Sequence, residues 1–104
     1  MTIELTNGKF DDFVKKGIVL VDFHADWCMP CVMMGPIVED MSKKFKGKLK
    51  VGKVNVEDNQ KLAQKHNILS IPTFLIFKDG KIIEQFVGAV SEEELENKMK
   101  KYVK

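Results

Sequence analysis

Residues 22–36, DFHADWCMPCVMMGP, contain both cysteines of the chain, two residues apart, and its only tryptophan. They follow IVLVDF (18–23), a continuous apolar run rich in β-branched residues, which is typical of a central strand covered on both faces. From about residue 30 to residue 45, apolar side chains recur at helical spacing, which predicts a long core-facing helix that Pro36 should kink. The cysteine pair therefore lies at a strand-to-helix turn.

The rest of the chain continues this alternation of strands and helices. Strands are predicted in TIEL near the N-terminus and over 48–56, 73–77 and 81–87, and helices from an Asn7 cap to Gly17, over 58–66 and from Ser91 onwards. The Asp-Gly pair in KDGK makes the last two strands an antiparallel hairpin, and Ser91 with Glu94 forms a capping box. The predicted order is βαβαβαββα, an α/β fold with a central mixed five-stranded sheet flanked by four helices.

The composition restricts the classes of function. With 104 residues and no internal repeat, we expect one domain over residues 1–104. The N-terminus lacks the order of a secretory signal, and no apolar stretch approaches the roughly 20 residues that cross a bilayer. A cytosolic protein that binds no membrane is expected. All 17 basic residues are lysine, dispersed among 15 acids, and the lack of arginine argues against recognition of nucleic acid.

The spacing of the cysteines suits reversible disulfide chemistry. If Cys28 begins the helix and Cys31 lies in its first turn, their α-carbons come within the roughly 4.4–6.8 Å of a disulfide. A bridge that closes so short a loop stabilises the fold little. The helix N-terminus favours a thiolate on Cys28. The pair predicts that Cys28 attacks a disulfide in a partner and that Cys31 then resolves the mixed disulfide.

Two other interpretations of the pair are a zinc half-site and a pair of inert buried thiols. Zinc normally takes four ligands, and only His24 and His66 remain, widely separated in the sequence. No metal site is expected. The position of the pair at a strand-to-helix turn favours redox chemistry over inert thiols.

The motif WCMPC after VLVDFHAD, with SIPTFLIFKDGKIIEQFVGA downstream, resembles the thioredoxin family over essentially the whole chain. The resemblance implies the thioredoxin fold and a protein-disulfide reductase. It implies no bound cofactor, since the cysteine pair itself carries two electrons. Disulfide-containing protein substrates and a separate thioredoxin reductase are the expected partners, and a monomer is the expected state.

The resemblance also assigns roles to residues around the motif. It makes Cys28 the exposed attacking thiol and Cys31 the buried resolving thiol, which together form the active-site disulfide. It places Asp22 in the interior behind Cys31, where the carboxylate would take the proton of that thiol through water, and Lys53 nearby as a modulator. Without the resemblance, the role of Asp22 stays open, because a carboxylate on a strand more often faces solvent or pairs with a lysine than takes part in catalysis.

A second segment around Pro72 completes the implied site. Most X-Pro bonds are trans, whereas the resemblance implies a cis bond between Ile71 and Pro72, packed against the cysteines. The backbone of Ile71 would then pair with an extended segment of the partner. Two alternatives stay open: Trp27 could be a core residue, and Gly88 could be only a turn glycine. The implied substrate-binding residues are Trp27, Met29, Pro30, Ser70, Ile71, Val87 and Gly88.

The chain departs from the common thioredoxin pattern at several positions. This chain has Met29 and Ser70 where the family commonly has glycine. It has His24 in place of the usual tryptophan and Val32 in place of a basic residue. Met29 leaves the reduction potential open, and His24 either adds a titration near neutrality or has no role. A glutaredoxin-like or oxidising disulfide exchanger and a scaffold or binding module on the same fold are the alternatives. The sequence has no cationic cleft for glutathione and no export signal, which favours the reductase.

Overall fold

The strands and helices follow the predicted order along the chain. The structure is a computed structural model that describes residues 2–103. Its elements are β1 (Ile3–Glu4), α1 (Asn7–Val14), β2 (Ile18–His24), α2 (Met29–Lys44), β3 (Lys50–Asn55), α3 (Gln60–Lys65), β4 (Thr73–Lys78), β5 (Lys81–Val87) and α4 (Glu92–Tyr102). The predicted order βαβαβαββα is confirmed.

The strands form one sheet in the order β1-β3-β2-β4-β5. β1, β3 and β2 are parallel, whereas β4 runs antiparallel to β2 and β5 antiparallel to β4. The predicted mixed five-stranded sheet is therefore confirmed. β2 occupies the middle of the sheet, and its residues from Val19 to His24 are all buried, as the continuous apolar run predicts.

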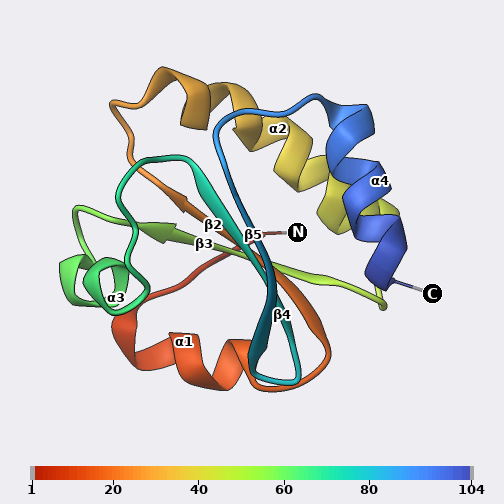
Figure 1. Cartoon of the computed structure of the whole chain (residues 1–104), viewed down its shortest axis with the longest axis horizontal. Helices are drawn as coiled ribbons and strands as arrows, with labels where there is room; N and C mark the ends of the chain where they lie inside the picture. The colour runs from red at the N-terminus through yellow and green to blue at the C-terminus, as the bar shows by residue number, and fades with distance from the viewer. Residues whose placement is uncertain (1, 104) are drawn as a thin grey trace.

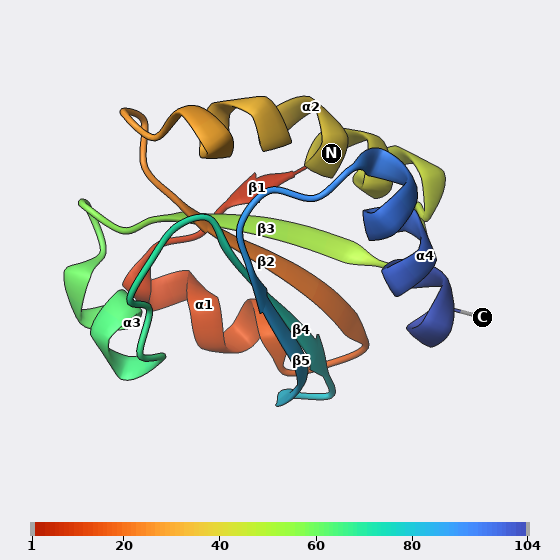
Figure 2. The same ribbon diagram turned by 45° about the horizontal axis from the view of Figure 1, so that its top comes forward.

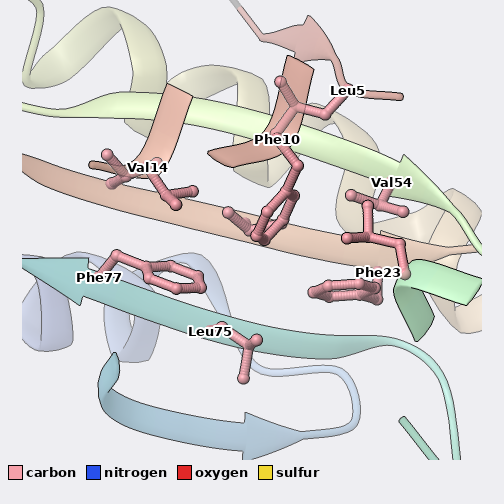
Figure 3. Packing of buried hydrophobic residues seen from close by; sticks show 10 residues of the cluster. Leu5, Phe10, Val14, Phe23, Val54, Leu75 and Phe77 are labelled. Carbon is pink, nitrogen blue, oxygen red and sulfur yellow. The ribbon is translucent and has the colours of Figure 1, made fainter. Parts of the chain in front are cut away.

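Helices cover both faces of the sheet, with α1 and α3 on one side and α2 and α4 on the other (Figure 1 and Figure 2). Each side encloses its own hydrophobic core. Figure 3 shows the core beneath α1, which contains Leu5, Phe10, Val14, Val19, Val21, Phe23, Val54, Leu62, Leu75 and Phe77. The core beneath α2 and α4 contains Leu20, Met34, Val38, Met41, Leu49, Val51, Phe74, Ile76, Leu95 and Met99.

The predicted bounds of the first helix are wrong at both ends. The extended residue before the helix is Thr6, whose carbonyl accepts the N–H groups of Lys9 and Phe10. The N–H of Asn7 is instead bonded at 3.2 Å to the side-chain oxygen of Asn59, which is remote in the sequence. The helix ends at Val14 instead of Gly17. A local capping pattern could not reveal the contact with Asn59.

The strand predicted over 81–87 is confirmed as β5, and the other bounds shift by one or two residues. The strand predicted over 48–56 is β3 (Lys50–Asn55), because the N–H groups of Lys48 and Leu49 bond back to the end of α2. The helix predicted over 58–66 is the shorter α3, and β2 and β4 each extend one residue further than predicted. The antiparallel hairpin is confirmed, with positive φ at Asp79 and Gly80 in its turn.

The C-terminal helix begins as the capping pattern predicts. The side-chain oxygen of Ser91 accepts the N–H of Glu94 at 3.1 Å, and Leu95 and Met99 are buried against the sheet. Between residues 2 and 103, no helix combines the length and the apolar character that crossing a membrane requires.

Candidate active site

The two cysteines stand at the start of α2, directly after the carboxyl end of β2. Cys28 is the N-cap residue, with extended backbone, and Pro30 lies within the first turn. A disulfide joins Cys28 to Cys31, with 5.2 Å between their α-carbons. The backbone N–H of Cys31 donates to the sulfur of Cys28 at 3.3 Å. The helix N-terminus therefore points a hydrogen-bond donor at Cys28, as the position of the motif predicts.

The predicted contrast in exposure between the cysteines is wrong for this disulfide form. Cys28 is 5% exposed and Cys31 is 4% exposed. The sulfur of Cys28 turns toward Cys31 and lies 3.9 Å from the carbonyl oxygen of Ile71. Ala25, Val56 and Ile71 pack around the pair. Access to Cys28 is thus limited by the segment that carries Ile71.

Asp22 lies in the interior, on the face of the sheet that α2 covers. It follows Leu20 at the two-residue period of a strand, and Leu20 belongs to the core beneath α2. Cys31 is the first residue of the buried stripe of α2. Asp22 is 0% exposed, and neither of its carboxyl oxygens has a hydrogen-bond partner among the described residues. The alternative that strand alternation turns Asp22 to solvent is therefore wrong.

Burial dominates the titration of Asp22. It raises the pKa of this carboxyl from 3.8 to about 7, against a smaller lowering by Lys53 and with a further increase from Glu4. Lys53 is the residue of β3 directly opposite Asp22, which agrees with the predicted proximity of the two. A carboxyl with a pKa near neutrality can both accept and release a proton under ordinary conditions.

Glu4 is a member of this region that the sequence did not indicate. It lies opposite Lys53 in the register of β1 with β3, which places it in one row with Lys53 and Asp22. Its influence on the pKa of Asp22 follows from that row. The alternation in TIEL shows that Glu4 and Leu5 point to opposite faces, but the partner strand is known only from the register.

The predicted cis peptide bond between Ile71 and Pro72 is present. The residue after it, Thr73, pairs with Phe23 at the end of β2 and with Val87 at the end of β5. The N–H of Gly88 donates to the carbonyl oxygen of Pro72 at 2.8 Å. The sheet therefore brings these predicted residues to the edge where the cysteine turn begins.

Exposed apolar side chains lie on the segments that form this edge. Trp27 is 67% exposed and Met29 66%, so the alternative that Trp27 is a core residue is wrong. Val87 is also exposed, and Ile71 is half-buried. Sequence reasoning missed Met33 and Leu69, which are 67% and 96% exposed. Met33 is not part of the buried stripe of α2. The helical periodicity of the sequence could therefore have indicated that this side chain is exposed.

His24 ends β2 and is buried, with 7% exposure. Its Nε2 lies 3.5 Å from Oε1 of Glu4. Burial, followed by Lys53, lowers the pKa of this imidazole below its usual value, whereas Glu4 and Asp26 oppose the decrease. Among residues 2–103, no three His, Cys, Asp or Glu side chains are arranged to hold a metal ion.

Comparison with known proteins places this geometry in a family. The family model described as Thioredoxin matches residues 1–101. The chain belongs to the thioredoxin family. It is 38% identical to the thioredoxin of Bacillus subtilis (strain 168) over 101 residues, which cover 97% of each chain. The thioredoxin of Staphylococcus aureus (strain N315) is 37% identical with the same coverage.

A solved thioredoxin structure has the same fold. A mutant thioredoxin from Halobacterium salinarum NRC-1 superposes with a TM-score of 0.90 and 32% sequence identity, covering 99% of this chain and 91% of that one. Thioredoxins are thiol–disulfide oxidoreductases, and this one is a protein-disulfide reductase with the redox motif Cys28-Met29-Pro30-Cys31. Disulfide-containing proteins and a thioredoxin reductase are the partners that the family implies. The predicted fold and function are confirmed.

Proposed function

We propose that Cys28 is the attacking thiol of this reductase and Cys31 the resolving thiol. The observation that carries this assignment is the hydrogen bond from the N–H of Cys31 to the sulfur of Cys28 at the N-cap of α2. In the reduced protein the same donor and the positive end of the helix stabilise a thiolate on Cys28. Cys31 stands instead on the buried stripe of the helix, where it faces the side of the sheet that carries Asp22.

The reaction then proceeds in two exchanges. The Cys28 thiolate attacks one sulfur of a partner disulfide, which forms a mixed disulfide and releases the other partner sulfur as a thiolate. Cys31 gives its proton to Asp22 through water, and its sulfur attacks the sulfur of Cys28. The second partner thiolate leaves, and Cys28 and Cys31 are joined as in the structure. The partner gains the two electrons that the cysteine pair loses, and a thioredoxin reductase must later supply two new electrons to the Cys28–Cys31 disulfide.

Asp22 is the proposed base in the second exchange, and Lys53 modulates it. The support is its complete burial on the α2 face and its pKa of about 7, which suits it to take a proton at neutral pH. Lys53, opposite Asp22, favours the ionised carboxylate. Pro72 shapes the wall beside the cysteines, since its carbonyl holds Gly88 in place.

The proposed docking surface is the apolar rim around Cys28. Exposed side chains of Trp27, Met29 and Val87 offer contact area to a partner, and Ile71 offers backbone outside the β4–β5 ladder. We expect an extended partner segment with apolar residues near its disulfide. Pro30, Ser70 and Gly88 complete this surface as the remaining predicted substrate-binding residues.

Cysteine variants test the assignment of the two thiols. Cys31→Ser, reduced and mixed with a test protein that has one exposed disulfide, should accumulate a covalent mixed disulfide, because the second exchange is blocked. Cys28→Ser is the matched control and should form almost none. Mass spectrometry of the quenched mixture measures both adducts. An adduct that forms equally well through Cys31 would contradict the assignment.

The same assay separates the role of Asp22 from that of the cysteines. Asp22→Ala should form the mixed disulfide at the parent rate and resolve it on the order of 100-fold more slowly, as expected when a general base is lost. Equal rates of resolution would refute that role.

A Cys28→Ser/Cys31→Ser double variant that retained full function in cells would favour the scaffold instead. The single domain, the cytosolic location, the monomeric state and the lack of a cofactor stay predictions.

A further inference from the structure

The sheet face beneath the start of α2 carries four ionisable side chains side by side. Glu4 of β1 lies opposite Lys53 of β3, and Lys53 lies opposite Asp22 of β2. His24 is two residues after Asp22 on the same strand, so it projects to the same face. The side chain of His24 reaches Glu4, with 3.5 Å between Nε2 and Oε1. We call these four residues the charge row.

The two buried members of the charge row share the same charged neighbours. Asp22 and His24 are 0% and 7% exposed, whereas the side chain of Glu4 is 63% exposed. Lys53 and Glu4 influence the titration of both buried groups. The remaining charge that faces His24 is Asp26, in the turn before α2. Protonation of one buried member therefore changes the charge that the other experiences.

We propose that His24 is a positioning residue for the acid–base step and that it sets, with Glu4, the pH range in which Asp22 can take the proton of Cys31. This inference rests on the proposed role of Asp22. When His24 is protonated, its charge offsets Glu4 and stabilises the Asp22 carboxylate. When His24 is neutral, the negative charge of Glu4 opposes ionisation of Asp22. His24 thus keeps a fraction of Asp22 ionised under acidic conditions.

Direct titration of the imidazoles by NMR tests the link between His24 and Asp22. Asp22→Asn should lower the pKa of His24 by about a few tenths of a unit, because Asp22, with a pKa of about 7, is only partly ionised in the pH range where His24 titrates. Glu4→Gln, a change at an exposed side chain, should also lower the pKa of His24. His66 is the internal control, since it packs among Phe10, Phe23 and Phe77 on the opposite face.

A pH profile of the second exchange tests the consequence for function. A chromophoric aromatic thiol is attached to Cys28 as a mixed disulfide, and its release is timed between pH 5 and pH 9. His24→Gln should resolve the adduct at the parent rate at pH 8 and several-fold more slowly at the acidic end. A merely structural role of His24 would slow the release by the same factor at every pH.

A control variant on the opposite face and three possible outcomes show how the inference could fail. Asp12→Asn removes an exposed carboxylate on α1, on the other face of the sheet, and should leave both the imidazole titrations and the profile unchanged. A pKa of His24 that neither Asp22→Asn nor Glu4→Gln shifts would overturn the inference. So would a His24→Gln profile parallel to that of the parent. If Asp22→Asn shifts the pKa of His24 but leaves resolution unchanged, the assignment of Asp22 as base fails, and the proposed role of His24 fails with it.

Discussion

Asp22 is the residue at which stability and chemistry conflict. Its carboxyl is buried and has no hydrogen-bond partner among residues 2–103, so ionisation is costly and burial raises its pKa from 3.8 to about 7. Below pH 4 the folded and unfolded chains both hold the proton. Between pH 4 and pH 7 the unfolded chain releases the proton while the folded chain keeps it, so the free energy of unfolding falls as the pH rises.

Replacing this carboxyl should remove that pH dependence. Across the shift from 3.8 to about 7, the loss in the parent amounts to about 4 kcal/mol. The free energy of unfolding of Asp22→Asn, relative to that of the parent, should therefore rise by about 4 kcal/mol between pH 3.5 and pH 8. The cost of the buried amide does not depend on pH and does not change this difference. Urea unfolding of the oxidised proteins at a series of pH values measures the difference. A constant difference between variant and parent would contradict the assigned pKa.

The N-caps of α1 and α4 provide a prediction at the scale of single elements. Ser91 caps α4 through its side chain, which accepts the N–H of Glu94 at 3.1 Å. Thr6 precedes α1 in the same position but makes no such side-chain bond. Ser91→Ala should lower the free energy of unfolding by about 1 kcal/mol without altering thiol–disulfide exchange, because α4 lies outside the site.

Thr6→Ala is the matched control for that loss. It removes a hydroxyl from an N-cap that makes no side-chain bond, so its effect on urea unfolding should be clearly smaller. Equal losses for the two variants would show that the bond of Ser91 does not stabilise α4.

Elements whose signals are local could be predicted from the sequence. The run that became β2 and the Asp79-Gly80 hairpin each carry their signal within a few residues. The start of α1 could not be predicted, because Asn7 is bonded to Asn59. The alignment of Glu4 with Lys53 and Asp22 could not be predicted either, since it depends on the register of β1 with β3. Contacts between distant segments set these features.

At the scale of the whole molecule, the site is assembled where separate segments meet. The end of β2 leads into Cys28, and the pairing of Phe23 with Thr73 brings Pro72 beside it. The pairing of β4 with β5 adds Val87. The cysteine chemistry could be predicted from the spacing of the pair and its position at a strand-to-helix turn, whereas the cis bond and the burial of Asp22 came only from the family resemblance. A strand pattern does not determine which neighbour covers a given face.

The most direct test of the central claim is the equilibrium reduction potential of the Cys28–Cys31 pair. The protein is incubated with defined mixtures of reduced and oxidised dithiol, and the fraction in the disulfide form is measured. A reductase of this family should give a value near the roughly −270 mV established for thioredoxin, despite Met29 between the cysteines. A value near roughly −120 mV would characterise a strong oxidant and would contradict the assignment as a protein-disulfide reductase.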